Sequence, residues 1–269
     1  MRYFFISDVH GQYDMMIDAL RAAGFDKEKD TLVNLGDSFD RGPDSRKVLE
    51  FLMSCPNRIL LWGNHDSRLY EVVYQIDCFN TYDKSNGMFE TLTSFMGSKN
   101  YTPFLFLRQL EEYQPATAKL LKQYFTELVY AAEWKDLIVT HAWLPLTDDG
   151  TVRGVTCVAN KFDWTEAIWS NTERILKWGD PNVFPDKDMI VGHWHAWRIA
   201  KLRGDTSRFT LGRDGNIKRV DTSTYVYHAP RGTTVTFIDG MSNGAPYGAS
   251  VNVIVREYDE APILHNYTY

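Results

Sequence analysis

The sequence has little cysteine, no long apolar run and no excess of basic charge, and each of these absences excludes a class of protein. Its three cysteines, Cys55, Cys78 and Cys157, are odd in number and far apart, so they indicate reduced thiols in a cytosolic protein rather than a disulfide framework. No apolar stretch approaches the roughly 18 residues that a membrane span needs. The apolar run at residues 3–6 is too short for a signal peptide, and we expect a cytoplasmic protein with no membrane partner.

The overall charge is acidic. The formal net charge is -6 and the pI is about 5.7, whereas a nucleic-acid-binding domain carries a basic face, so nucleic acid is not an expected partner. Hydrophobic residues make up 44% of the chain and charged residues 24%, which is the balance of an ordinary globular protein. Because the 269 residues contain no repeat or linker-like stretch, we expect a single domain over residues 1–269.

The first part of the chain alternates short apolar runs with helical periodicity. Residues 3–6, 32–35 and 59–62 read as buried strands. Between them, residues 15–23 have apolar side chains at helical spacing, and a second helix is predicted to start at Pro43, since proline is favourable in a first helical turn. This alternation predicts a parallel sheet with right-handed crossovers.

The rest of the chain departs from this rhythm. Residues 67–127 are aromatic and polar, with helical pattern in three places, and are predicted to form a helical insertion that caps the site. Strands are then predicted at residues 128–132, 136–140, 189–191, 234–238 and 251–255, with a hairpin around Asp214-Gly215. This half is expected to be antiparallel. The whole is predicted to be α/β (α+β-like), with two packed sheets and helices outside.

Polar side chains with lone pairs follow five of the predicted strands. They are Asp8 and His10, Asp37 and Asp40, Asn64 and His65, His141, and His193 and His195. Ligands in open α/β sheets bind at the carboxyl ends of the strands, so these groups are expected to meet at one rim.

Each residue taken alone has a simpler interpretation. A single histidine after a strand is usually a partly exposed polar residue, and an aspartate there, such as Asp8 or Asp66, is often a helix N-cap. The stretch from Gly36 to Gly42 fits a solvated turn equally well. Five strand ends that all carry such groups are much harder to explain in this way.

The set of side chains favours a pair of metal ions. Carboxylate, amide and imidazole donors without thiolate suit Mn, Fe, Zn or Ni, and there are too many donors for one tetrahedral ion. Two ions that share Asp37 can activate a bridging water and stabilise an in-line displacement at phosphorus. His65 is then a candidate proton donor, Asp40 a candidate to orient it, and Arg41 a clamp for phosphoryl oxygens.

These motifs resemble those of the calcineurin-like metallophosphoesterases, most closely the small bacterial and phage Ser/Thr phosphoprotein phosphatases. The resemblance rests on Ser7-Asp8-Val9-His10-Gly11, Gly36-Asp37-Ser38-Phe39-Asp40-Arg41-Gly42, Gly63-Asn64-His65-Asp66, His141 and Gly192-His193. It implies a β-sandwich of mixed sheets flanked by helices, with a dinuclear centre at one edge. It also implies two divalent metal ions as cofactors, and we expect Mn2+ ahead of Fe, Zn or Ni.

The resemblance implies a role for each matching residue. Asp8, His10 and Asp37 would hold the first metal, and His195 would reach it from the Gly-His-x-His motif of the broader superfamily. Asp37, Asn64, His141 and His193 would hold the second metal. His65 and Asp40 match the family's proton-donor pair, and Arg41 matches its phosphate clamp.

Several positions depart from the phosphatase pattern. Ser7 stands where glycine is usual, and Asp66 stands where glutamate is usual. No arginine is in register after Trp169 for the second phosphate clamp, which leaves Arg174 as a substitute. Asp66 and Gly192-His193-Trp194 look more like the symmetrical diadenosine tetraphosphate hydrolases, but those tend to lack the second aspartate, here Asp40.

Three functions follow as expectations. The first is a Ser/Thr-type protein phosphatase that uses metal-bound hydroxide on phosphoproteins or small phosphomonoesters. The second is a hydrolase of dinucleoside polyphosphates or other nucleotides, with Trp194, Trp197 or the aromatic insertion as a stacking surface for bases. The third is a binding module without catalysis. Tyr247 is expected to pack in the ordinary way, and Asp239 to sit behind the metals or cap a turn.

Overall fold

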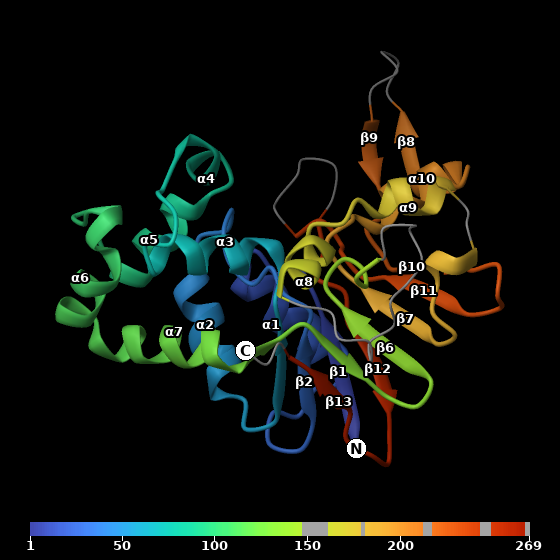
Figure 1. Cartoon of the computed structure of the whole chain (residues 1–269), viewed down its shortest axis with the longest axis horizontal. Helices are drawn as coiled ribbons and strands as arrows, with labels where there is room; N and C mark the ends of the chain where they lie inside the picture. Colours follow the sequence, from blue (N-terminus) through green and yellow to red (C-terminus); the bar gives the residue numbers. More distant parts are fainter. Residues whose placement is uncertain (147–160, 179–180, 212–216, 243–248, 267–269) are drawn as a thin grey trace.

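Two β-sheets pack face to face at the centre of the molecule, and helices cover their outer faces (Figure 1). We describe a computed structural model, which covers residues 1–146, 161–178, 181–211, 217–242 and 249–266. Mixed sheets flanked by helices confirm the predicted fold class.

The first part of the chain alternates strands and helices, as predicted. Its elements are β1 (Arg2–Ile6), α1 (Tyr13–Ala22), β2 (Thr31–Asn34), α2 (Ser45–Ser54) and β3 (Arg58–Leu61). The three strands pair in parallel, because each helix returns the chain to the same end of the sheet. α2 begins slightly later than the predicted start at Pro43, after its N-cap Asp44.

The next segment is helical, as predicted for the insertion. Its elements are α3 (Asn64–Val73), α4 (Thr81–Ser85), α5 (Met88–Met96), η1 (Pro103–Leu105), α6 (Phe106–Tyr113) and α7 (Pro115–Glu127). Helices α5 and α7 pack against α2, and α6 packs against α7. Figure 1 shows α4, α5, α6 and α7 to one side of the sheets, where they form a flanking layer.

The remaining elements mix strands and short helices. They are β4 (Leu128–Val129), β5 (Ala131–Glu133), β6 (Leu137–Thr140), α8 (Lys161–Ile168), α9 (Thr172–Trp178), η2 (Pro181–Val183), β7 (Asp188–Val191), α10 (Ala196–Leu202), η3 (Thr206–Arg208), β8 (Phe209–Leu211), β9 (Ile217–Val220), β10 (Tyr225–His228), β11 (Thr234–Phe237), β12 (Ile254–Glu257) and β13 (Ile263–His265). The predicted strand at residues 128–132 is divided between the sheets, since β4 pairs with β3 and β5 pairs with β6.

The strand order is β12-β1-β2-β3-β4 in one sheet and β10-β11-β7-β6-β5-β13 in the other. The prediction of an antiparallel second half is wrong at its centre, where β7 is parallel to both β6 and β11. The reason is that helices α8 and α9 separate β6 from β7, and α10 follows β7, so the chain crosses back before the next strand. β8 and β9 pair antiparallel as predicted, and their turn lies outside the described residues.

Strands at the centre of both sheets bury side chains on both faces. Tyr3 and Phe5 of β1 pack between the sheets against Val139 of β6 and Ile190 of β7. The alternate side chains of β1–β3 pack against α1, α2 and α5–α7, and those of β6, β7 and β11 pack against α8–α10. Double burial explains why these strands read as continuous apolar runs.

None of the helices in the described ranges combines the length and apolarity that crossing a bilayer requires. Cys55 is buried, Cys78 is exposed, and both are free thiols. Cys157 lies outside the described residues.

Candidate active site and metal centre

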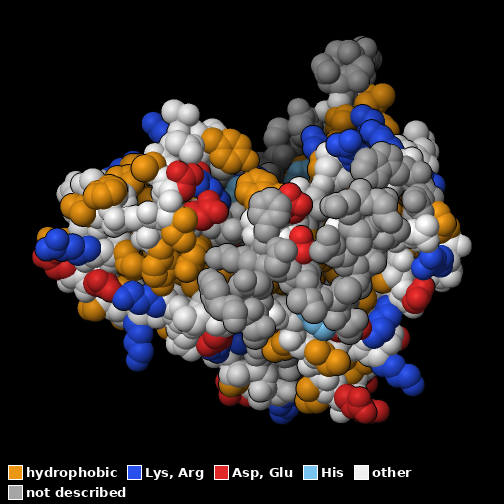
Figure 2. Space-filling view, in the orientation of Figure 1, with side chains coloured by type: hydrophobic (Ala, Val, Ile, Leu, Met, Phe, Trp, Pro, Cys, Tyr) orange, Lys and Arg blue, Asp and Glu red, His pale blue; other side chains and the backbone are white. Residues whose placement is uncertain are grey.

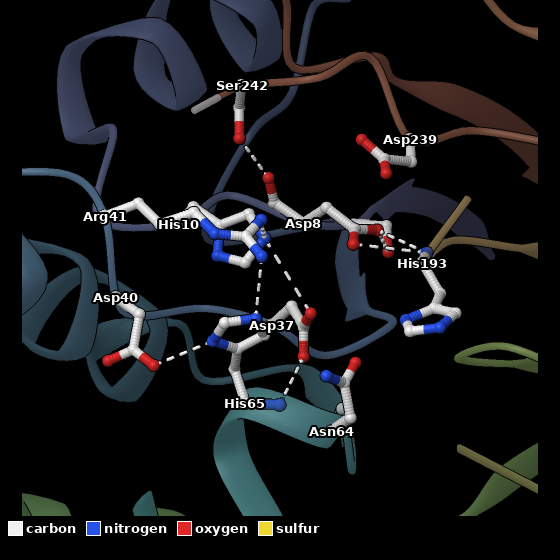
Figure 3. Close-up of polar contacts among 12 residues, drawn as sticks. Asp8, His10, Asp37, Asp40, Arg41, Asn64, His65, His193, Asp239 and Ser242 are labelled. Atoms are coloured by element: carbon white, nitrogen blue, oxygen red, sulfur yellow. Dashed lines mark hydrogen bonds and ion pairs between the residues drawn. The ribbon is translucent and has the colours of Figure 1, made fainter. Parts of the chain in front are cut away.

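Polar residues from both sheets meet at one edge of the sandwich (Figure 3). The backbone N–H of His193 donates to both carboxylate oxygens of Asp8, at 3.1 and 2.9 Å, which joins the end of β7 to the end of β1. His141 Nε2 lies 3.0 Å from Asn64 Oδ1, and its Nδ1 lies 2.8 Å from the carbonyl oxygen of Leu35. The ends of β2, β3 and β6 therefore converge on the same place.

Asp37 lies between two groups of potential metal ligands. Its Oδ2 is 3.8 Å from His10 Nε2, and its Oδ1 is 3.5 Å from His141 Nε2. His10, Asp37 and His65 form one group, and Asp37, His141 and His193 form the other, with ligand atoms within 4.8 Å of one another in each. A buried carboxylate with imidazoles on both sides has the arrangement of a bridging ligand.

The electrostatics of the site fit divalent cations. Burial and repulsion from Asp239 and Asp37 raise the pKa of Asp8 well above its usual value. Burial lowers the pKa of His10 well below its usual value and that of His193 to about 3, so both imidazoles are neutral and keep a lone pair. Crowded buried carboxylates beside neutral imidazoles are stabilised by bound cations, and the residues present therefore fit a pair of divalent ions.

The backbone is strained where these residues lie. Six of them have positive φ angles, namely Asp8 (51°), His10 (47°), Asp37 (53°), Asp40 (68°), Arg41 (66°) and His193 (63°). In the described part of the chain, only Gln75 and Met241 among the other non-glycine residues do so. Left-handed backbone at non-glycine residues persists where the surrounding structure enforces it, and it concentrates at functional sites.

Asp40 and Arg41 place the imidazole of His65. His65 Nδ1 lies 2.7 Å from Asp40 Oδ2, and Nε2 lies 2.9 Å from a guanidinium nitrogen of Arg41. The other guanidinium nitrogen lies 2.7 Å from His10 Nε2. Burial works to lower the pKa of His65, but the carboxylates of Asp37 and Asp40 outweigh it and raise that pKa, which suits a group that delivers a proton.

Asp66 supports the backbone of Asp37. Its Oδ2 accepts hydrogen bonds from the N–H groups of Asp37 at 2.6 Å and Gly63 at 3.1 Å, and its Oδ1 accepts one from the Tyr124 hydroxyl at 3.0 Å. Asp66 is therefore not the N-cap of α3, as one interpretation expected, but the third helical residue, whose carboxylate accepts the N–H of the N-cap Gly63. Burial and repulsion from Asp37 raise the pKa of Asp66 to about 7.

Asp239 caps a turn, which is one of the two positions expected for it, and its position relative to the metals stays a prediction. It is buried, its Oδ2 lies 2.9 Å from His195 Nδ1, and its Oδ1 accepts the N–H of Met241 at 2.7 Å. Burial works to raise the pKa of Asp239, but His195 outweighs it and lowers that pKa. Neither metal-ligand group includes His195, so its contact with the first metal stays a prediction.

The cluster opens into a pocket of about 240 Å³. It is lined by Asp8, His10, Asp37, Arg41, Asn64, His65, His193, Trp194, His195 and Arg198. Figure 2 shows a hollow between the flanking helices and the side of α10, where Lys and Arg side chains gather. No lining residue comes from residues 67–127, and the role of this segment as a cap stays a prediction.

The second arginine of the pocket is not the predicted one. Arg198 lines the pocket, whereas Arg174 does not. Trp194 also lines it, but Trp197 is only 9% exposed and packs with Val220 and Met241. Trp197 therefore offers no free ring for a base, and Tyr247 lies outside the described residues.

The helical segment contacts the site from behind Asp40. Thr91 Oγ1 donates to Asp40 Oδ1 at 2.9 Å and accepts the N–H of Asp40 at 2.8 Å. Gly87 has a φ of +88°, and a Cβ there would collide with the backbone of Arg41. The sequence gives no signal for Thr91, because its position in α5 also fits an ordinary buried helical face.

We expect Gly87→Ala to lower both stability and kcat, because the new Cβ displaces the loop that carries Asp40 and Arg41. Displacements of this kind cost roughly 10- to 100-fold in rate. Gly24→Ala is the matched control, since Gly24 has a φ of +77° with nothing within 4 Å of its Cβ position. It should cost about 1 kcal/mol of unfolding free energy and leave kcat unchanged. Urea unfolding measures the stability of each variant, and steady-state assays measure its kcat. Equal losses of stability and of kcat in the two variants would contradict the prediction.

Comparison with known proteins gives both a family and relatives. The family profile described as calcineurin-like phosphoesterase matches residues 1–220. A symmetrical bis(5'-nucleosyl)-tetraphosphatase of Buchnera aphidicola (subsp. Acyrthosiphon pisum, strain 5A) is 42% identical over 73 residues, which are 27% of this chain and 27% of that protein. One of Proteus mirabilis (strain HI4320) is 40% identical over 87 residues, 32% of each. The matched part thus spans about a third of these relatives or less.

Solved structures overlap only loosely. A metallophosphoesterase from Sphaerobacter thermophilus has a TM-score of 0.44 at 16% identity, over 100% of this chain and 89% of that chain. A protein serine/threonine phosphatase from Saccharomyces cerevisiae has a TM-score of 0.47 at 14% identity, over 97% and 82%. Overlaps at this level say nothing about the substrate. The family profile, in contrast, covers most of the chain, including the five strand ends that form the site, and the chain belongs to the metal-dependent calcineurin-like phosphoesterases.

Proposed function

We propose that this protein hydrolyses dinucleoside polyphosphates at a dinuclear metal centre and cleaves a tetraphosphate bridge at its middle. The observation that carries the proposal is the identity of 42% over 73 residues to a symmetrical bis(5'-nucleosyl)-tetraphosphatase, in a chain whose site gathers the donors for two ions. Water adds across the central P–O–P bond: one product gains the hydroxyl, and the other keeps the bridging oxygen and gains the proton. Two nucleoside diphosphates result.

Named residues divide the work in this proposal. Asp8, His10 and Asp37 would hold one ion, and Asp37, Asn64, His141 and His193 would hold the other. When bound, such ions supply positive charge to the phosphoryl group and lower the pKa of water. Mn2+ is our first choice of metal for an oxygen- and imidazole-rich set.

Three side chains do the remaining chemistry. The guanidinium of Arg41, which lies between His10 and His65, would turn to the phosphoryl oxygens when a substrate enters. His65 would protonate the leaving oxygen through Nε2, while Asp40 keeps the other ring nitrogen occupied. The positive charge that His65 carries before transfer is stabilised by the buried Asp40 carboxylate.

A second candidate function is hydrolysis of phosphomonoesters of the Ser/Thr protein type, and the dyad of Asp40 and His65 favours it. The hydrogen bond between His65 Nδ1 and Asp40 Oδ2 is 2.7 Å long. A serine alkoxide is strongly basic and needs a proton as it leaves, whereas a phosphate leaves as a weak base with a second pKa of about 6. A well-built proton donor is therefore of more use on an ester than on an anhydride.

Paired assays on one preparation of Mn2+-loaded protein separate the candidates. We expect kcat/KM for diadenosine tetraphosphate to exceed that for a phosphoserine peptide by at least about tenfold, since specificity is a ratio of these constants. The reverse ratio would support the phosphatase. Metal bound without hydrolysis of either substrate, or of phosphotyrosine peptides and phosphodiesters, would indicate a binding module.

A further inference from the structure

Arg198 is a cation in the active-site pocket that no acidic residue of the described ranges holds. It lies on α10, three residues after His195, and lines the same pocket as Arg41. In the described ranges its guanidinium has no hydrogen bond or ion pair. It lies over the ring of Trp197, whose centroid is 5.8 Å from the guanidinium carbon.

Two other arginines follow in the same part of the chain, and neither lines the pocket. The Arg203 guanidinium lies 5.0 Å from the ring centroid of Tyr227. Arg208 bonds to Ser223 and pairs with Asp221 at 3.4 Å. Arg198 alone among these three lines the pocket.

The charge of the pocket exceeds what one phosphomonoester needs. Among the described residues, its lining contains two carboxylates, Asp8 and Asp37, and in the proposed function both would hold metal ions. Two divalent ions and Arg41 already outweigh the dianion of a single phosphate. A further arginine beside them adds repulsion unless additional negative charge enters with the substrate.

We propose that Arg198 binds the phosphate next to the one that is cleaved, so that the pocket selects diphosphate and longer chains over monoesters. This deepens the proposed function and rests on it for the identity of the substrate. A guanidinium suits the task because its planar fork binds two phosphate oxygens at once. Arg41 and Arg198 come from opposite sheets, one after β2 and one after β7, so they bracket the phosphate chain.

Direct binding of inorganic anions tests the subsite without any nucleotide. Titration calorimetry on Mn2+-loaded protein, with metal in constant excess, compares pyrophosphate with orthophosphate. We expect Arg198→Ala to weaken pyrophosphate binding about 10- to 100-fold, which is about 1.4 to 2.8 kcal/mol at 1.4 kcal/mol per tenfold. Orthophosphate binding should weaken at least about fivefold less. Equal losses for both anions, or none for pyrophosphate, would overturn the proposal.

Two further variants separate charge, geometry and general surface effects. Arg203→Ala removes an arginine from the other end of α10 that does not line the pocket, and we expect wild-type affinity for both anions. Arg198→Lys keeps the charge and loses the fork, so its pyrophosphate affinity should be intermediate. If Arg203→Ala weakened pyrophosphate binding as much as Arg198→Ala, the positive electrostatic potential of the whole surface would explain the effect, and the subsite would be rejected.

Kinetics then connect the subsite to the substrate. In Arg198→Ala, kcat/KM for diadenosine tetraphosphate should fall at least about tenfold more than kcat/KM for p-nitrophenyl phosphate, mainly through KM. A protein that cleaves phosphopeptides but no dinucleotide would refute the proposed function, and the pyrophosphate titration would still decide the role of Arg198. The diphosphate subsite would also be overturned if Arg198→Ala left pyrophosphate binding unchanged and lowered kcat/KM only for phosphopeptides with an acidic residue beside the phosphorylated one.

Discussion

Asp37→Asn is expected to lower kcat at least about 10³-fold and to remove bound metal. Asp37 is buried, and its two oxygens lie 3.5 Å from His141 Nε2 and 3.8 Å from His10 Nε2. An amide has one weak neutral oxygen ligand where the carboxylate has two charged ones, so both ions would lose the ligand that Asp37 is proposed to share between them. The loss of several kcal/mol of charge stabilisation corresponds to this change in rate. Elemental analysis of dialysed protein and single-turnover assays measure the two effects.

Asp30→Asn is a matched control for this variant. Asp30 is also buried and lies just before the other end of β2, where it pairs with Arg2 at 2.7 Å. Its replacement should lower stability while metal content and kcat of the folded protein stay at wild-type values. Full metal content in Asp37→Asn would contradict the bridging assignment, whatever its activity.

His65→Asn is expected to lower kcat by about 10²- to 10⁴-fold on substrates with basic leaving groups while both metals stay bound. The imidazole lies between Asp40 and Arg41, where it can donate a proton to a leaving oxygen. The loss should shrink for p-nitrophenyl phosphate, whose leaving group needs no proton. Asp40→Asn should give a smaller loss, and the double variant should resemble His65→Asn, because the two residues act as a unit.

His265→Asn provides the comparison for His65. It also removes a histidine that contacts a carboxylate, since His265 Nε2 lies 2.8 Å from Glu133 Oε2, but this pair joins β13 to β5 outside the pocket. We expect its kcat to be unchanged. The proton-donor role of His65 would be refuted by equal losses in His65→Asn on alkyl and p-nitrophenyl esters.

The pattern of apolar and polar residues predicted the strands and helices that depend on their own short stretch of sequence. The strands β1, β2 and β3 and the helices between them follow from apolar periodicity and from polar residues that end each run. The parallel pairing of β7 with β6 and β11 did not follow, because side-chain alternation carries no information on strand direction. β13 is short, and its partner β5 lies far away in the sequence, so its pairing depends on contacts that no short window contains.

The site divides in the same way. Strand-end motifs brought Asp8, Asp37 and His193 into one prediction because each follows its own apolar run directly. Thr91 and Arg198 carry no such local mark, since each lies on a helix and reaches the site only through the folded arrangement. Arg174 was only a substitute for an arginine missing from its register, and register along the sequence does not specify that α10, which carries Arg198, borders the pocket.

Two cations that share the carboxylate of Asp37 are the central feature of the proposed mechanism. Anomalous diffraction from crystals of the Mn2+-loaded protein tests this directly. It should show two peaks, one on the side of Asp37 that faces His10 and one on the side that faces His141 and His193. A single peak, or two peaks without Asp37 between them, would contradict it.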